Sequence, residues 1–289
     1  MADIFTFPDG IDDRSSVTGM LTPRLIWDEP RVAATVAAFE MSERQRRDRS
    51  GPRLVITGDG AKLEIFRTSD SLRWSIHDPA TEEPATPPAL PTRDQATARA
   101  AAVLAQRGLA RPEASVASVA ESVHSRFGPG IKLLARHPVA IHVNYEFQLD
   151  GLPVFGPGAK VQVTFRDQGS PAQLYAFWRR PSAGQDYDTI GYQRAVELVR
   201  NHPSFATMVT GGKARVVFDQ VELGYYAFPA SEVQGMLVPV YRFHGQVANP
   251  NVPEPHVFYR YVVAVAFRPE DVKPIRMTAR GALPTVFNA

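Results

Sequence analysis

Histidine side chains are the residues of this sequence whose chemistry best suits metal binding. His137 and His142 flank Pro138, which excludes a helix, and on a strand their odd spacing puts them on opposite faces. His244 and His256 would approach one another if the strands that they flank were paired. A two-histidine pair without a carboxylate is a weak signal for a metal ion. We therefore predict no metal site and no cofactor.

Acid–base and nucleophilic catalysis find equally little support in the sequence. Neither H-E-x-x-H nor G-x-S-x-G occurs, and the chain has no cysteine for a thiolate nucleophile or a disulfide. Glu146 and Glu222 would serve as bases, but any polar face of a sheet supplies such residues. We predict that the protein is not an enzyme. A cyclase or hydrolase that uses Glu or His as its base is left as an alternative.

Aromatic and arginine side chains are better candidates for a binding site, because Tyr, Trp and Arg are the usual anchors of interfaces. Adjacent aromatic residues on a strand point to opposite faces, so pairs such as Tyr225 and Tyr226 do not both enter one core. Most aromatic residues are expected in the core. The predicted peptide-binding residues are Tyr175, Trp178, Arg179, Arg180, Tyr226, Tyr241, Phe243 and Tyr259.

The elements that must hold these side chains are mainly strands. Apolar and polar residues alternate over 141–149 and 161–165, and a third apolar run covers 174–178. A period of two indicates strands with one buried face, and the turns between them favour an antiparallel meander. Three short strands are predicted within 54–76, and further strands follow from Val216.

Three helices and two linkers complete the prediction. Asp28 would cap a helix with Pro30 in its first turn. Thr92 and Gln95 fit a capping box for a helix that ends at Gly108. Asp188 or Thr189 would cap a third helix. Prolines crowd 79–91, which is typical of a linker, and 181–185 forms a second one.

A helix followed by antiparallel strands thus occurs at 92–180 and again at 188–280. A helix needs to lie across one face of such a meander to close its core. The predicted fold class is therefore α+β, with tandem cystatin-like units and a small strand-rich extension at the N-terminus. The predicted domains are 1–91 (N-terminal helix, short strands and linker), 92–184 (first unit) and 185–289 (second unit).

Charge and hydropathy exclude several partner classes. The 289 residues contain 32 Lys and Arg against 30 Asp and Glu, and this net charge of +2 does not favour nucleic acid or an anionic membrane. Apolar residues make up 44% of the chain, but no run approaches the length of a membrane span. The first residues lack the basic start and apolar core of a signal peptide, so we expect a cytoplasmic protein.

Residues 145–156 resemble a hairpin of known propeptides. Tyr145, Gly151, Pro153, Val154 and Gly156 match the pattern Y-x-x-x-x-x-G-x-P-V-x-G of the FTP and PepSY group, the propeptide domains that precede thermolysin-type zinc proteases. The strands at 223–226, 237–243 and 259–267 resemble the second half of these propeptides, so that the resemblance covers about 92–280. The protease itself does not follow, and the chain looks like a free-standing pro-segment.

The resemblance implies a protein that holds polypeptide. The chain is also similar in kind to the tandem peptide-binding proteins of crocagin biosynthesis, in which a ribosomally made precursor peptide is modified. The function so implied is capture of a precursor peptide, with β-augmentation as the mode, and its presentation to a tailoring enzyme. The alternative is an inhibitor or folding chaperone that acts in trans on a thermolysin-like protease. A homodimer through an uncovered sheet edge is also predicted.

Overall fold

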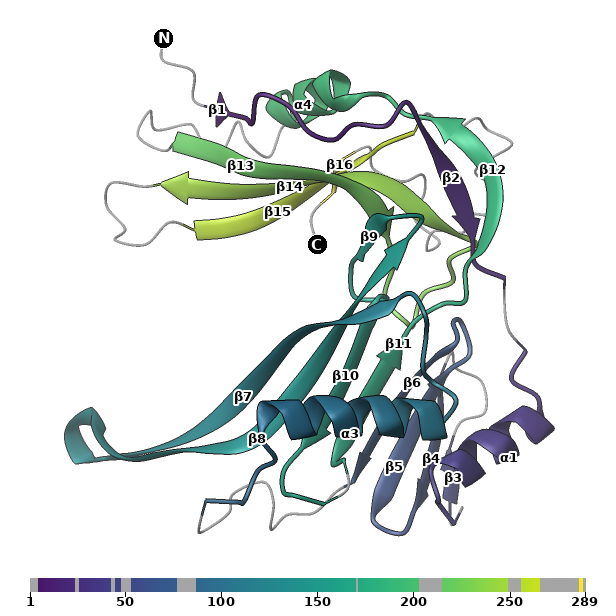
Figure 1. The fold of residues 1–289 in the computed structure, drawn as a ribbon, viewed down its shortest axis with the longest axis vertical. Helices are drawn as coiled ribbons and strands as arrows, with labels where there is room; N and C mark the ends of the chain where they lie inside the picture. The colour runs from purple at the N-terminus through teal and green to yellow at the C-terminus, as the bar shows by residue number, and fades with distance from the viewer. Residues whose placement is uncertain are drawn as a thin grey trace.

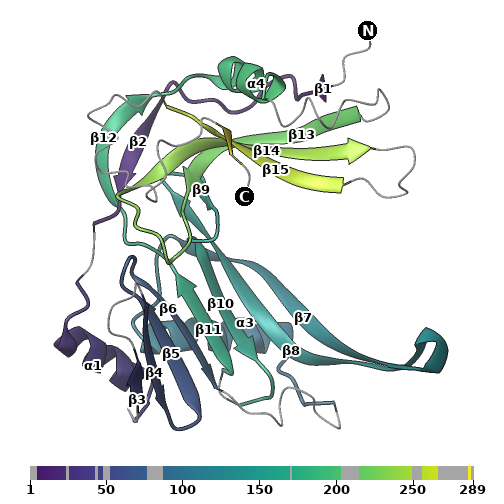
Figure 2. The same cartoon turned by 180° about the vertical axis from the view of Figure 1, so that it is seen from behind.

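The computed structural model describes residues 5–23, 26–42, 45–47, 53–76, 87–169, 171–202, 215–248, 256–265 and 286–287. Residues 79–86 of the predicted proline-rich linker at 79–91 lie outside these residues. The described strands form one mixed sheet of 16 strands, and its main path runs β12-β2-β14-β13-β9-β8-β10-β11-β6-β5-β4-β3. Figures 1 and 2 show that this sheet bends into two halves, with β9 between them.

The lower half in Figure 1 is an antiparallel sheet with helices against it. Helix α3 (Arg93–Gln106) lies across the sheet, and α1 (Glu29–Ala38) lies near its far edge. The strands of this half are β7 (Ala114–Gly128), β8 (Lys132–Leu149), β10 (Lys160–Phe165), β11 (Gln173–Phe177), β6 (Ser71–Ile76), β5 (Ala61–Phe66), β4 (Arg53–Gly58) and β3 (Gln45–Arg47). The predicted meander is confirmed, because β8 pairs with β10 and β10 with β11, both antiparallel.

The upper half combines strands from both ends of the chain. Its helix α4 (Tyr192–Arg200) packs against β15 and lies above the sheet in Figure 1. The strands are β1 (Phe5–Thr6), β2 (Ser16–Leu21), β9 (Leu152–Phe155), β12 (Ser182–Asp188), β13 (Arg215–Tyr226), β14 (Met236–Ala248), β15 (His256–Val263) and β16 (Val286–Phe287). None of the described helices combines the length and apolar character that crossing a bilayer requires.

The predicted fold class of tandem cystatin-like units is wrong. The protein is instead a large mixed sheet with three short α-helices in its described part. Strand pairing crosses the predicted units: β6 pairs with β11, and β2 pairs with β12 and β14. One hydrophobic cluster also extends through both halves, from Val17 to Val265. Local periodicity indicated the strands of the meander, but the predicted second linker at 181–185 falls mostly in strand β12. Periodicity also carries no information on which strands become neighbours.

The link between the halves is a parallel contact that the sequence did not indicate. The β8–β9 hairpin turns at Asp150 and Gly151, which both have positive φ, and places Val154 and Phe155 opposite Tyr225 and Tyr226 of β13. The side chains of Val154, Phe155 and both tyrosines are buried. A short hairpin strand thus pairs with β8 on one edge and with β13 on the other, which makes the two halves continuous.

The predicted helix starts are confirmed for two helices and wrong for the third. Asp28 accepts a hydrogen bond from the Arg31 amide, and Thr92 and Gln95 form the capping box. The cap of α4 is neither Asp188 nor Thr189. The carboxylate of Asp13 instead accepts from the Tyr192 amide at 2.8 Å. This cap comes from 179 residues away in the chain, so local sequence did not reveal it.

Candidate functional site

Five of the eight predicted peptide-binding residues are buried, and a side chain without exposed surface offers no contact to a ligand. Trp178 stacks on Phe147 with ring centroids 3.9 Å apart. Arg179 donates to backbone carbonyls, and Tyr241 donates to Asp13 at 2.6 Å. The buried residues are Trp178, Arg179, Tyr226, Tyr241 and Phe243. Burial raises the pKa of Tyr226 to about 12, in keeping with its place in the interior.

The other three predicted residues are exposed or half-buried, but they do not form one site. Tyr175 lies on β11, where the guanidinium of Arg73 sits 4.9 Å from its ring centroid. Tyr259 is 41% exposed on β15, beside His244 at 5.2 Å between ring centroids. Figure 1 places β11 and β15 in opposite halves of the molecule. Arg180 is exposed just after β11 and belongs to the cluster described next.

A buried aspartate and three arginines form a cluster of charge at the turn between β5 and β6. Asp70, in the turn between β5 and β6, is 5% exposed in its side chain and pairs with Arg31. Its other carboxylate oxygen is 2.5 Å from Nε of Arg180 and 4.0 Å from Nη2 of Arg111. Arg31 belongs to α1, Arg180 follows β11, and Arg111 lies between α3 and β7. The fold thus collects them around one carboxylate from distant parts of the sequence.

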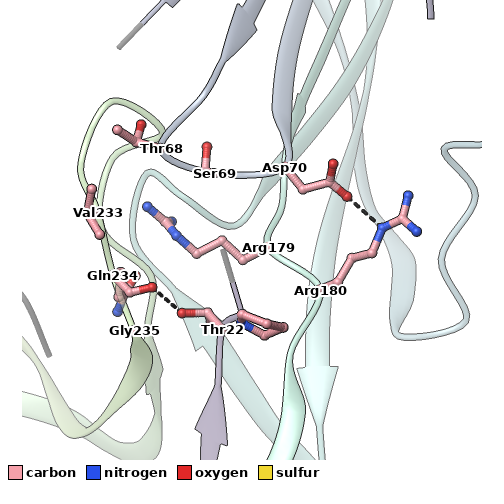
Figure 3. Close-up of a pocket in the computed structure, with 10 residues that line it drawn as sticks. Thr22, Thr68, Ser69, Asp70, Arg179, Arg180, Val233, Gln234 and Gly235 are labelled. Carbon is pink, nitrogen blue, oxygen red and sulfur yellow. Dashed lines mark hydrogen bonds and ion pairs between the residues drawn. The ribbon is translucent and has the colours of Figure 1, made fainter. Parts of the chain in front are cut away.

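Two pockets adjoin this cluster. We call the first the Asp70 pocket: a cavity of about 220 Å³ lined by Trp27, Phe39 and Asp70, by Arg31, Arg107, Arg111 and Arg180, and by neighbouring small residues of α1 and of the turn after α3. The second cavity, of about 210 Å³, shares Asp70 and Arg180 and extends to Thr22, Arg179 and Gln234. Figure 3 shows this second cavity, with the Asp70–Arg180 pair along one side of it.

Arg179 has a structural role in the wall of the second cavity. It is 3% exposed and donates to the carbonyls of Phe228, Pro229 and Glu232, at distances between 2.7 and 3.0 Å. Burial lowers its pKa to about 10, and the nearby Glu232 partly offsets that effect. A buried guanidinium that donates to three carbonyls fixes the loop between β13 and β14, so Arg179 holds this wall of the cavity in place.

His142 lies between two hydroxyl groups, one from β7 and one from β10. His142 contacts the Ser122 hydroxyl at 2.6 Å and the Thr164 hydroxyl at 2.9 Å. Burial, with added repulsion from Arg166 and Lys160, lowers its pKa. A serine–histidine pair without a carboxylate on the second nitrogen, and with a weakened base, is poorly suited to nucleophilic catalysis. In the described part of the chain no group of three or more His, Asp or Glu residues could hold a metal ion.

The predicted approach of His244 to His256 does not occur in the strand register. β14 and β15 are paired, but His244 lies opposite Tyr259 and His256 lies opposite Val247. His244 contacts the carboxylate of Asp219 at 2.5 Å instead. Glu222, one of the two candidate bases, pairs with Arg242. This ion pair already engages the Glu222 carboxylate within the fold.

Most residues of strand β7 are exposed, and the sequence analysis did not single this strand out. β7 and β8, joined by the 3₁₀ turn η1 (Pro129–Ile131), form a hairpin whose tip projects beyond the rest of the molecule (Figure 1). Apolar side chains stay exposed along it, from Val116 through Phe127 at 57% to Ile131 at 85%. Within the described chain, β7 pairs with β8 alone. Its sequence, ASVASVAESVHSRFG, has only weak alternation, which is why periodicity did not reveal it.

Comparison with known proteins gives no functional identity. No family model matches the chain, and no curated protein matches it significantly, so the resemblance to the FTP and PepSY propeptides and to crocagin proteins stays a prediction. A solved structure that resembles this chain is that of an uncharacterized protein from Eubacterium rectale ATCC 33656. Its TM-score is 0.48, with 10% sequence identity over 87% of this chain and 85% of the other.

Proposed function

We propose that this protein binds an extended peptide as an added strand on the outer edge of β7 and holds it for a partner protein to act on. A precursor peptide and its modifying enzyme are the pair that the sequence resemblance favours. The pairing of β7 supports this function most directly. β7 has 15 residues, and among the described strands only β8 pairs with it, through Ala114–Phe147 at one end and Gly128–Lys132 at the other.

An edge strand of this length presents a row of backbone donors and acceptors to the solvent. Natural proteins block such edges with lysine, proline, bulges or a covering element. β7 contains neither Lys nor Pro, and its protection consists of three register shifts along the pairing with β8. Between Ser118 and Ser122 the register is regular, so a peptide could hydrogen-bond there without interruption.

Side chains of β7 favour a peptide with apolar residues. Val116, Val123 and Phe127 are exposed large apolar side chains, whereas Glu121 and Arg126 are the only charged residues of the strand. One charge of each sign gives little preference for an acidic or a basic peptide. Backbone hydrogen bonds would supply affinity, and contacts with the exposed apolar side chains would select the alternate residues of the peptide.

The test uses a peptide selected from a displayed library of short peptides on the purified protein. Its backbone amides are then methylated one at a time, and each peptide is titrated by calorimetry. A strand added to an edge turns alternate amides toward the protein. We expect methylation of every second peptide amide to abolish binding. Methylation of the amides between them should be tolerated. Selection of no peptide, or uniform tolerance of methylation, would contradict strand addition.

Two proline variants test the edge from the side of the protein. Consecutive residues of an antiparallel strand direct their amides to opposite edges, so Ala120→Pro and Glu121→Pro each remove a donor from a different edge. Both positions are exposed, and both lie in the regular part of the pairing with β8. We expect one variant to keep its melting temperature and lose the peptide, and the other to be destabilised. Glu121→Ala controls for the lost carboxylate. Unchanged peptide binding in both proline variants would refute the assignment to β7.

A further inference from the structure

The Asp70 pocket carries an excess of positive charge that its own residues do not neutralise. Four arginines line it, and Asp70 is the single acidic residue of the lining. Two further carboxylates act on it from outside the lining, Glu40 on Arg107 and Glu113 on Arg111. Asp70 accepts from Arg31 through one oxygen and from Arg180 through the other. Nη2 of Arg111 lies 4.0 Å from that second oxygen, beyond hydrogen-bond distance. Little carboxylate is therefore left for Arg107 and Arg111.

Two buried guanidinium donors of this pocket have no hydrogen-bond partner among the described residues. They are Nη1 of Arg107 and Nε of Arg111. The guanidinium of Arg107 lies 4.4 Å from the ring centroids of both Phe39 and Trp74, which fix its place without satisfying its N–H groups. Burial lowers the pKa of Arg107, and burial together with repulsion from Arg180 lowers that of Arg111. A buried donor without a partner also occurs at Nε of Arg179, and it is the presence of two such donors beside one cavity that points to a ligand.

We propose that the Asp70 pocket is a binding site for an oxyanion, a carboxylate or a phosphate group on a small organic acid. Guanidinium groups match the fork geometry of both anions, and paired guanidiniums hold them by charge-assisted hydrogen bonds. The anion would accept from Arg107 and Arg111, and it would offset the repulsion between Arg111 and Arg180. On the wall of the pocket opposite Arg107 and Arg111, Asp70 holds Arg31 and Arg180 in place.

The dimensions of the pocket limit the ligand. About 220 Å³ is less than the volume of a typical cofactor site, so the pocket fits an anionic group with a short organic body. Trp27 and Phe39 supply apolar lining for that body. The site involves α1, the turn after α3 and the segment after β11, and no residue of β7. Failure of this proposal therefore leaves peptide binding on β7 untouched.

The test titrates inorganic phosphate and succinate into the full-length protein by calorimetry at low ionic strength, with chloride at equal ionic strength as the reference anion. Arg180→Gln removes one of the cations, and Arg194→Gln is its matched control. Both side chains are exposed, at 54% and 60%, and each pairs with an acidic residue, Asp70 and Glu197 respectively. Because both side chains are exposed, neither substitution removes core packing, and circular dichroism verifies that both variants are folded.

We expect saturable binding of at least one of the two oxyanions, weakened about tenfold or more in Arg180→Gln and unchanged in Arg194→Gln. Binding of phosphate alone identifies the group as a phosphate, and binding of succinate alone identifies it as a carboxylate. The proposal is overturned if neither oxyanion saturates the protein at millimolar concentration. It is also overturned if both variants lose affinity equally, since that result reports only the general charge of the protein.

Discussion

Substitution of Gly224 by alanine is predicted to break the contact between the two halves of the sheet. Gly224 lies on β13 next to β9, and a Cβ atom there would sit 2.4 Å from the carbonyl oxygen of Pro153 and 2.6 Å from the ring of Phe155. Real Cβ atoms do not approach other atoms so closely, and the first of these neighbours is backbone. β9 must therefore move away from β13, and it cannot do so by changing a rotamer.

The expected cost follows from the size of this clash. Overpacking a well-packed interior by one methyl group costs about 1–3 kcal/mol, and a clash with backbone belongs at the upper end of that range. For a chain of 289 residues, about 3 kcal/mol corresponds to a fall in melting temperature of roughly 5 °C. Gly10→Ala is the matched control, because a Cβ at Gly10 meets no atom within 4 Å.

Differential scanning calorimetry provides the assay. Wild-type protein should unfold in one transition, since one hydrophobic cluster runs through both halves. The Gly224→Ala variant should melt several degrees lower or separate into two transitions, and Gly10→Ala should melt within about one degree of wild type. A Gly224→Ala variant as stable as the control would refute the parallel contact of β9 with β13.

Three further predictions concern single side chains. Thr92→Ala removes the capping box that Thr92 forms with Gln95 and should cost about 1 kcal/mol in urea unfolding, with Ser at the same position as the neutral control. Burial raises the pKa of Tyr225 from about 10 to about 12, so its contribution to stability is complete below pH 10 and is lost as the pH rises to 12. Stability measured over that range should fall less steeply in Tyr225→Phe, and parallel curves would contradict the shift. Burial lowers the pKa of His142, so its imidazole should titrate by NMR below the usual His value of about 6.5. A midpoint above that value would contradict the burial of this side chain.

Much of the secondary structure could be predicted from the sequence, because it depends on short-range interactions. The cap at Asp28 and the capping box at Thr92 need only residues within one turn, and both are confirmed. The alternation over 141–149 marks one strand face whatever lies opposite, and the meander that follows is also confirmed. The strand β7 was missed because its exposed Ser and Ala residues give no contrast between a buried and a solvent face.

The candidate sites could not be predicted, because they depend on contacts between distant residues. The sequence predicted Trp178, Arg179 and Arg180 as binding anchors. In the structure Trp178 is buried against Phe147, and Arg179 holds a loop. Only Arg180 of this group reaches a pocket and remains exposed. Asp70, its partner, lies 110 residues away, and no local pattern marks an aspartate that will become buried between arginines.

Sequence alone determined the meander strands, the short strands within 54–76, the presence of three helices and where two of them begin, since hydrophobic periodicity and capping act over a few residues. Tertiary structure decided which strands are neighbours, how one sheet replaces the expected tandem units, which edge stays open and which cations share a carboxylate. The physical reason is that backbone hydrogen bonds between strands are nearly independent of side chains. Register and order are therefore fixed by the packing of the whole chain.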